Sequence, residues 1–280
     1  MNPKLILVPT DFSRVAQTAL NHAIAIAKST HGKINLLHLV PNQNMILEAK
    51  TKLQLAQSMA MEDYGFHVDV TARVGTIFEE ISDLAAELSA DLIVMGTHGM
   101  RGLQFIKGSN ALRIVTSAKL PFIIVQEKEI SENGYQNIVV PLDLHKETKQ
   151  KLSLVADMAK YFDSKVHIIV PREKDEYLRN TVTRNLTFAE TFFEGMGIAH
   201  SSKISENDSD DFDETIIAYA VEIGADLISI MNLPGVSLAS LIGGSYAQNI
   251  ITNKPNIPVL ILNPKEVTNV SIFGAYTGAG

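Results

Sequence analysis

The chain contains two copies of one sequence pattern, and this duplication limits the folds available to it. Lys-Leu-Ile-Leu-Val-Pro-Thr-Asp at residues 4–11 recurs as Asn-Ile-Val-Val-Pro-Leu-Asp at 137–143, and Ala-Asp-Leu-Ile-Val-Met at 90–95 recurs as Ala-Asp-Leu-Ile-Ser-Ile at 225–230. The repeats lie 132 to 136 residues apart, which is too long for a solenoid unit and suits a duplicated globular domain. We therefore predict one domain over residues 1–130, a second over 135–266, and a tail over 267–280.

Each half alternates short aliphatic runs with stretches of helical periodicity. Residues 4–8 form an aliphatic run typical of a strand buried on both faces of a parallel sheet. A helix is expected next, capped by Asp11 or Ser13 and ended by Gly32. The pattern then predicts strands over 33–40, 66–73, 91–95 and 121–125 and helices over 45–64, 77–88 and 110–117. The second half repeats the plan, with strands near Asn137, Lys165, Ile198, Asp226 and Ile257.

This alternation predicts an α/β fold of two tandem doubly wound domains. Parallel neighbouring strands need long crossover connections, and the helical stretches between the strands supply them. Each domain is expected to hold a five-stranded parallel sheet with helices on both faces.

Composition excludes several functional classes. The chain has no cysteine, which rules out disulfides, thiolate zinc sites and cysteine nucleophiles. Its formal net charge is −7 without a basic cluster, so we expect no nucleic-acid partner. No apolar run reaches the roughly 20 residues that span a bilayer, and the N-terminus lacks the apolar core of a signal peptide. We therefore expect a cytoplasmic protein that does not bind membranes.

One acidic segment is expected to lie in solvent. Residues 205–213, Ser-Glu-Asn-Asp-Ser-Asp-Asp-Phe-Asp, have the composition of a solvated surface loop. They lack the central glycine and terminal glutamate of an EF-hand calcium loop. No metal-ligating side chains are predicted.

The region after Asp91 carries the strongest functional signal. Asp-Leu-Ile-Val-Met-Gly-Thr-His-Gly at 91–99 is followed by a loop and by Gly108, Ser109 and Asn110. An aliphatic strand, a glycine turn and a Gly-Ser pair before a helix present backbone amides to phosphate. Simpler interpretations remain for each residue alone, because glycines also make turns, and serine and aspartate also cap helices.

Four segments together resemble the universal stress protein family: residues 8–13, 37–40, 95–99 and 108–109. The resemblance covers nearly the whole chain, as two tandem family domains. Nucleotide-binding members have the pattern Gly, two residues, Gly, nine residues, Gly, then Ser or Thr. This chain has eight residues between Gly99 and Gly108. The resemblance implies a sheet of order 3-2-1-4-5 with ATP at the carboxyl ends of strands one and four, where the strand order reverses.

The resemblance also implies roles for individual residues. Asp11 would accept a hydrogen bond from a ribose hydroxyl, and the Val40 backbone would bond the adenine edge. Gly96 would let the backbone approach the ligand. The implied cofactor-binding set is Pro9, Thr10, Asp11, Val40, Met95, Gly96, His98, Gly99, Gly108, Ser109 and Asn110. The implied cofactor is ATP, with AMP and ADP as alternatives, and Mg²⁺ held through the phosphates.

The second half departs from this pattern. Met231 stands in the place of Gly96, and Leu233 and Pro234 replace His98 and Gly99. Asp143 and the Gly-Gly-Ser of residues 243–245 remain. A methionine would fill space that a nucleotide needs, so we predict one nucleotide per chain, in the first half.

The fifth strands, 121–125 and 257–262, would lie at sheet edges, and long apolar edges are usually covered. The two halves are therefore expected to pair with each other, and the protein to form a homodimer.

Three functions fit the sequence. The leading hypothesis is an ATP-binding stress-response or regulatory module with little or no hydrolysis. It is preferred over an enzyme because the chain has no Gly-Lys-Ser/Thr phosphate loop and no Gly-x-Ser-x-Gly elbow. The alternatives are a regulatory interaction protein with vestigial pockets in both halves, and a slow ATPase or nucleotidyl-transfer enzyme whose turnover would disappear in Asp11→Ala.

Overall fold

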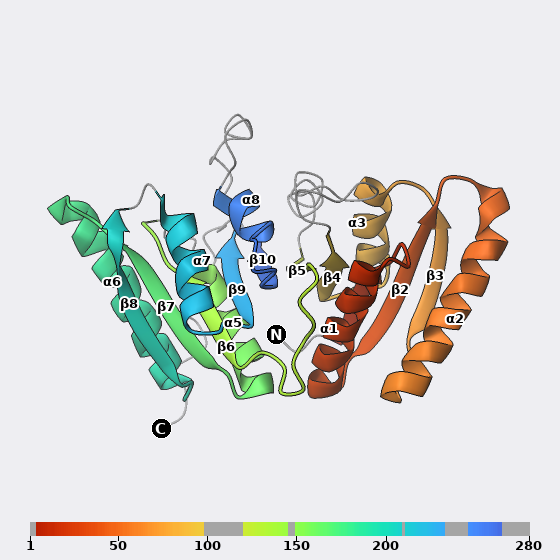
Figure 1. The fold of residues 1–280 in the computed structure, drawn as a ribbon, viewed down its shortest axis with the longest axis horizontal. Coiled ribbons are helices and arrows are strands. Elements are labelled where there is room, and N and C mark those ends of the chain that lie inside the picture. The colour runs from red at the N-terminus through yellow and green to blue at the C-terminus, as the bar shows by residue number, and fades with distance from the viewer. Residues whose placement is uncertain (1–3, 98–119, 145–148, 209–210, 233–245, 265–280) are drawn as a thin grey trace, which may run out of the picture.

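A computed structural model of the chain describes residues 4–97, 120–144, 149–208, 211–232 and 246–264. Within them ten strands form a single sheet with helices packed against it (Figure 1). The elements of the first half are β1 Leu5–Pro9, α1 Arg14–Thr30, β2 Lys33–Val40, the 3₁₀ turn η1 Gln43–Met45, α2 Ile46–Tyr64, β3 Asp69–Val74, α3 Ile77–Glu87, β4 Leu92–Gly96 and β5 Phe122–Val125. Those of the second half are β6 Asn137–Pro141, α5 Lys151–Phe162, β7 Lys165–Arg172, α6 Glu176–Gly195, β8 His200–Asp208, α7 Phe212–Glu222, β9 Leu227–Met231, α8 Tyr246–Ile251 and β10 Val259–Leu262.

The strand order confirms the doubly wound fold. It runs β3-β2-β1-β4-β5-β10-β9-β6-β7-β8, so each half has the order 3-2-1-4-5 when its strands are counted from its own start. Strands within each half are parallel. The two sheets join because β5 and β10 pair antiparallel, with Ile124 opposite Val259 and Phe122 opposite Ile261. The result is one continuous sheet rather than two separate ones.

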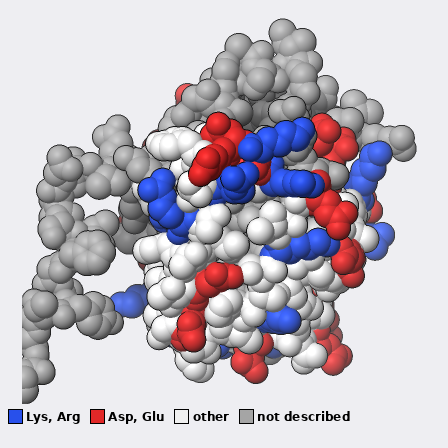
Figure 2. Space-filling model, turned by 90° about the vertical axis from the view of Figure 1, so that its left-hand side faces the viewer, with Lys and Arg blue, Asp and Glu red and all other residues white. Residues whose placement is uncertain are grey.

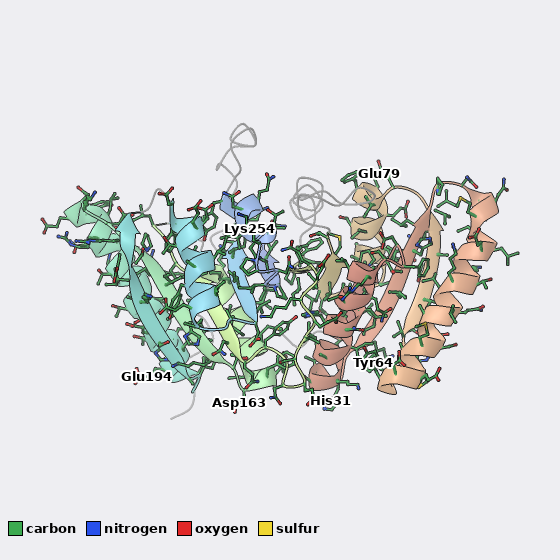
Figure 3. The ribbon with its side chains drawn as sticks, in the orientation of Figure 1. His31, Tyr64, Glu79, Asp163, Glu194 and Lys254 are labelled. Atoms are coloured by element: carbon green, nitrogen blue, oxygen red, sulfur yellow. The ribbon has the colours of Figure 1, made fainter. Side chains whose placement is uncertain are left out.

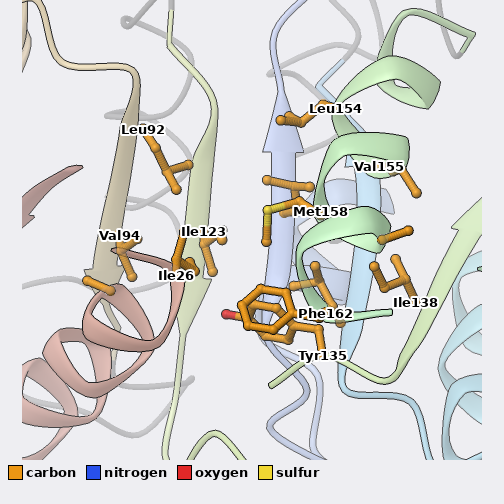
Figure 4. Close-up of a cluster of buried hydrophobic side chains, with 14 of the residues drawn as sticks. Ile26, Leu92, Val94, Ile123, Tyr135, Ile138, Leu154, Val155, Met158 and Phe162 are labelled. Atoms are coloured by element: carbon orange, nitrogen blue, oxygen red, sulfur yellow. The ribbon is translucent and has the colours of Figure 1, made fainter. Parts of the chain in front are cut away.

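Helices cover both faces of this sheet. Successive residues of a strand point to opposite faces, and in β1 Ile6 and Val8 belong to one buried cluster while Leu7 belongs to the other. The first cluster contains residues of α1, α2, α5 and α6, and the second contains residues of α3, α7 and α8. Figure 4 shows part of the first cluster, where Tyr135 packs edge-on against Phe162.

The first helix shows how the sequence sets its own boundaries. The Ser13 hydroxyl accepts a hydrogen bond from the backbone N–H of Ala16 (3.2 Å), so Ser13, and not Asp11, is the N-cap. The helix ends at His31, which adopts a left-handed conformation with φ 54°. Asp163 ends α5 in the same way, with φ 51°. Both capping residues lie at the lower end of the molecule in Figure 3, which reflects the duplication.

The expectation of a surface loop over 205–213 was wrong in part. Strand β8 continues to Asp208, and Ser205 is only 2 % exposed. Among the described strands β8 pairs only with β7, so it is an edge strand. One side of an edge strand faces water, which allows an acidic, polar sequence to remain extended. Helix α7 then begins at Phe212, inside the predicted loop.

The segment that connects the halves is fixed to both of them. The Gln126 amide donates hydrogen bonds to the carbonyls of Ile251 (3.3 Å) and Asn253 (3.0 Å) in the second half. On the other side, the Thr18 hydroxyl of α1 donates to the carboxylate of Glu129 (2.7 Å). The connection is therefore part of the packed structure.

Candidate functional site

A pocket of about 350 Å³ opens at the carboxyl ends of β1, β2 and β4, where the strand order reverses around β1. In open α/β sheets this crevice is where ligands bind. Four segments that are far apart in the sequence line it, with residues Pro9, Thr10, Asp11, Ser13, Val15, Ala16, Leu37, His38, Leu39, Val40, Pro41, Gly75, Thr76, Ile77, Met95 and Gly96.

The structure brings together every predicted site residue that it describes. Six of the predicted residues line this pocket, namely Pro9, Thr10, Asp11, Val40, Met95 and Gly96. The other five, His98, Gly99, Gly108, Ser109 and Asn110, lie outside the described residues. Sequence reasoning missed Gly75, Thr76 and Ile77. They follow β3 directly, and the rule that parallel strands end at one edge of the sheet would have found them.

Within the described residues, one carboxylate oxygen of Asp11 accepts a hydrogen bond and the other does not. Its Oδ1 accepts a hydrogen bond from the backbone N–H of Ser13 (2.9 Å). Within the described residues Oδ2 has no hydrogen-bond partner. The carboxylate lies beside the first turn of α1, where unpaired N–H groups and the helix dipole favour negative charge. Asp11 is therefore an oriented acceptor at the pocket wall.

The turn after β1 is fixed by a histidine. His38 Nδ1 lies 2.7 Å from the carbonyl oxygen of Thr10, so this nitrogen carries the proton and donates. The ring of Phe12 packs against that of His38 with centroids 4.4 Å apart, and Phe12 has a φ of 62°. A phenylalanine in the left-handed region is unfavourable. These contacts hold the turn that carries Asp11.

The backbone groups on the two edges of β2 have different hydrogen-bond partners at its carboxyl end. The Val40 carbonyl accepts a hydrogen bond from the N–H of Gly75 (3.1 Å), on the side of β3. The Leu37 carbonyl accepts from Thr10 on the side of β1 (2.8 Å). Because backbone groups alternate between the two edges of a strand, those of Leu39 face the side of β1. Register pairing of β1 with β2 stops at Pro9 and Leu37, so the Leu39 backbone lies beyond the last paired position.

Gly96 has a structural reason to be glycine. A Cβ built on it would lie 2.7 Å from the carbonyl oxygen of Val15 and 2.8 Å from its carbonyl carbon. Backbone atoms of a helix cannot move aside cheaply, so any side chain here would displace the first turn of α1. The absence of a side chain at Gly96 lets that turn reach the end of β4.

The second half has a different residue at the position that corresponds to Gly96. Ile6 pairs with Leu92, and Ile138 pairs with Leu227, which puts Met231 at the register position of Gly96. Met231 is 3 % exposed. A buried methionine thus takes the place of Gly96 in the second half.

Further side chains fill the second half near Asp143. The buried Lys151 ammonium donates to the Pro141 carbonyl, and burial lowers the pKa of Lys151 to about 8 although Asp143 opposes this. Counted back from the helix C-cap, Lys151 matches Ala19 of α1. Burial, with Asp143 and Asp213, raises the pKa of Tyr246 well above its ordinary value. The other motif residues of this half, Leu233, Pro234 and residues 243–245, lie outside the described residues.

The described residues contain neither a candidate metal site nor a membrane-spanning helix. No group of three or more His, Asp or Glu side chains there could hold a metal ion. In the same residues, no helix has the length and apolar character needed to cross a bilayer.

Comparisons with known proteins agree with one another. The model of the universal stress protein family matches residues 3–126. Universal stress protein MJ0531 of Methanocaldococcus jannaschii is 30% identical over 141 residues, which cover 44% of this chain and 82% of that protein. MJ0577 of the same organism is 28% identical over 156 residues, covering 45% and 96%. The crystal structure of a universal stress protein from Archaeoglobus fulgidus covers 95% of this chain and 98% of that one, with a TM-score of 0.73 and 19% identity. This last likeness is one of fold.

Proposed function

The chain belongs to the universal stress protein family, and we propose that it is an ATP-binding regulatory member with its nucleotide in the pocket of the first half. The observation that carries the proposal is the convergence of Asp11, the carboxyl end of β2 and Ile77 on one pocket at the point where the strand order reverses. Its volume of about 350 Å³ lies within the range of small-molecule sites.

Each wall of the pocket has a task in this proposal. The uncommitted Oδ2 of Asp11 accepts from a ribose hydroxyl. The backbone of Leu39 bonds the adenine edge, because its groups face the pocket side of β2 while the Val40 carbonyl is engaged by Gly75. This assignment moves the expected adenine contact by one residue. Apolar side chains of Ile77 and Met95 supply apolar surface for the base.

We propose that the protein hydrolyses the bound ATP slowly or not at all. Among the described lining residues Asp11 is the single carboxylate, and His38 already uses one ring nitrogen to hold the Thr10 carbonyl. General acid–base catalysis needs a group free to exchange a proton with the reacting atoms. Any Mg²⁺ would be bound through the nucleotide's phosphates.

One nucleotide per chain is expected. Near Asp143 the second half holds the buried Met231 and Lys151 and the half-buried Tyr246. These side chains occupy the region where a ligand would have to enter. We further propose that the halves are separate domains, over 1–130 and 135–266, held together through β5 and β10, and that the protein acts in the cytoplasm as a homodimer.

One observation favours a second candidate, a regulatory interaction protein whose pocket holds no nucleotide. Gly96 is explained by its packing against Val15 alone. The glycine therefore does not count as support for a ligand, and the proposal rests on the remaining walls.

Release of small molecules from purified protein, measured by mass spectrometry per chain, tests the proposal. We expect about one adenine nucleotide in the wild type and none in Asp11→Asn. Asp143→Asn is the matched control, because this aspartate occupies the equivalent position in the second half, and it should keep the nucleotide. Two nucleotides per chain, or equal loss in both variants, would contradict the single site. No nucleotide, and no binding of added ATP and magnesium by calorimetry, would favour the interaction protein. ATP turnover lost in Asp11→Asn would show an enzyme.

A further inference from the structure

The second half contains a larger pocket that the nucleotide proposal does not use. It has a volume of about 600 Å³ and lies at the carboxyl ends of β7 and β8, under the first turns of α6. Its floor is apolar, formed by residues such as Val182, Leu186 and Ile204. Its rim carries the cations Arg172, Lys174 and Arg179.

An irregularity in the edge strand shapes this pocket. Val170 pairs with Ile204, but Arg172 pairs with Asp208, so Pro171 alone lies opposite three residues of β8. A proline has no N–H to donate to the ladder. The extra residues of the bulge bring Ser205 and Glu206 to the pocket wall. Bulges commonly occur at sheet edges beside functional sites, where they redirect side chains.

The duplicated first half lacks this arrangement. There Leu39 and Val40 pair with Arg73 and Val74 without a shift of register. The β-strand registers make Val40 the counterpart of Arg172. The position that is an aliphatic residue in the first half is thus a cation in the second. Two halves with one fold differ here in backbone and in charge, which indicates that the pocket serves a separate purpose.

Two of the cations on the rim, Arg172 and Arg179, are available to a ligand. Arg172 and Arg179 are exposed, and within the described residues neither guanidinium forms an ion pair. Arg179 Nη1 lies 3.5 Å from the carbonyl oxygen of Lys174, which holds its side chain over the turn between β7 and α6. Figure 2 shows Lys and Arg on the upper part of this face of the molecule, with Asp and Glu among them. Guanidinium groups bind carboxylates and phosphates through paired N–H donors.

The apolar part of the pocket is unusually open to water. Ile204 is 62% exposed although it lies on a strand beside the buried Val182. Carboxylates also line the pocket, and one of them is Glu206. The pKa of Lys203 is raised mainly by its hydrogen bond to Glu222 and, to a smaller extent, by the nearby charge of Glu206. The open lining therefore combines an apolar surface with the guanidinium groups of Arg172 and Arg179, beside the carboxylates of Glu173 and Glu206.

We propose that this pocket is a second ligand site, which binds an amphiphilic anion with its acid group at Arg172 and Arg179 and its apolar body against Ile204 and Leu186. The chemical class is a medium-chain carboxylate or a compound of the same shape and charge. The site is independent of the nucleotide pocket, which lies at the carboxyl ends of β1, β2 and β4 in the first half.

Methyl NMR of the full chain with ¹³C-labelled isoleucine tests this site, with sodium decanoate as the probe. Ile204 reports on the proposed site, and Ile77 reports on the pocket of the first half. We expect the Ile204 methyl signal to shift in a saturable manner. The Ile77 methyl signal should keep its chemical shift. Arg179→Glu should weaken binding roughly tenfold or more, as loss of a charged hydrogen bond implies.

Arg184→Glu is the matched control. Arg184 lies on the same helix, is exposed and donates to the Thr181 hydroxyl (3.1 Å), but it does not line the pocket. The same change of charge there should leave the affinity within about twofold. A decanoate titration that shifts Ile77 alone, that shifts neither methyl at millimolar concentration, or that is weakened equally by both variants would overturn the proposal.

Discussion

The buried imidazole of His22 in α1 shares a 2.8 Å hydrogen bond with the hydroxyl of Tyr135, which follows the connection between the halves. Its other nitrogen, Nε2, lies 3.0 Å from the carbonyl of Lys128 and must donate to it. In the neutral ring Nδ1 then accepts from Tyr135. Protonation would give His22 a second donor, facing the tyrosine hydroxyl in a buried site.

This arrangement predicts loss of stability in mild acid. Burial lowers the pKa of His22 to about 4, while an unfolded histidine has a pKa of about 6.5. The unfolded chain therefore binds more protons between these values. His22 destabilises the fold progressively as the pH falls from about 6.5 to 4, by up to about 3 kcal/mol.

Urea unfolding at pH 7.5 and 4.5 measures this effect. His22→Gln should show a clearly smaller loss between the two pH values than the wild type. The exposed His31→Asn should behave like the wild type, because asparagine also tolerates the left-handed conformation of that residue. An unchanged pH dependence in His22→Gln would contradict the prediction.

Gly96→Ala should destabilise the protein in the absence of any nucleotide. Its Cβ would meet the backbone of Val15, and overpacking of this kind typically costs about 1–3 kcal/mol. Gly195→Ala is the control, because a Cβ on this helical glycine meets nothing within 4 Å. It should be neutral or slightly stabilising, as alanine favours helix. If Gly96→Ala were as stable as the wild type, the packing explanation would be wrong.

Gln126→Ala should weaken the junction between the halves. The Gln126 side chain is 4 % exposed, and its amide serves two carbonyls across the β5–β10 boundary. Buried carbonyls left unpaired are expected to cost about 1–3 kcal/mol in the free energy of unfolding. Gln54→Ala, an exposed change on α2, should alter it by no more than about 0.5 kcal/mol. Equal effects in urea unfolding would argue against a role for the junction.

Ser13→Ala should destabilise α1 by about 1 kcal/mol, since Ser13 is the N-cap. The loss should appear in thermal unfolding without ligand. Asp11→Asn should lose less stability than Ser13→Ala, because the amide oxygen of asparagine can still accept a hydrogen bond from the Ser13 N–H. The reverse order of stability would restore Asp11 as the cap.

Much of the fold follows from short aliphatic runs. The predicted strand over 33–40 coincides with β2 because most of its residues are buried, and its apolar composition reveals this. β8 was harder, since nearly all of its residues are polar although it is a paired strand. Composition alone does not distinguish an edge strand from a loop, because backbone pairing on one side leaves no mark in the sequence.

The sequence predicted where the residues of the site lie along the strands better than it predicted which groups they contact. Pro9, Asp11 and Gly96 could be placed at strand ends, but the sequence does not tell which edge of β2 each backbone group faces. Val40 and Leu39 are therefore distinguished only by the Gly75 hydrogen bond. Lys151 looks like a surface residue of a helix in the sequence, and its burial depends on packing with residues far along the chain.

The antiparallel pairing of β5 with β10 also affects how the two halves can change during evolution. In a symmetric dimer of identical subunits every substitution appears on both sides of the interface, so a change must be tolerated twice. Here the two partners are encoded separately within one chain, and each meets the same partner at high effective concentration. A lysine in the place of Ala19, or an arginine in the place of Val40, thus alters one side only. Fusion lets one half specialise while the other keeps its pocket.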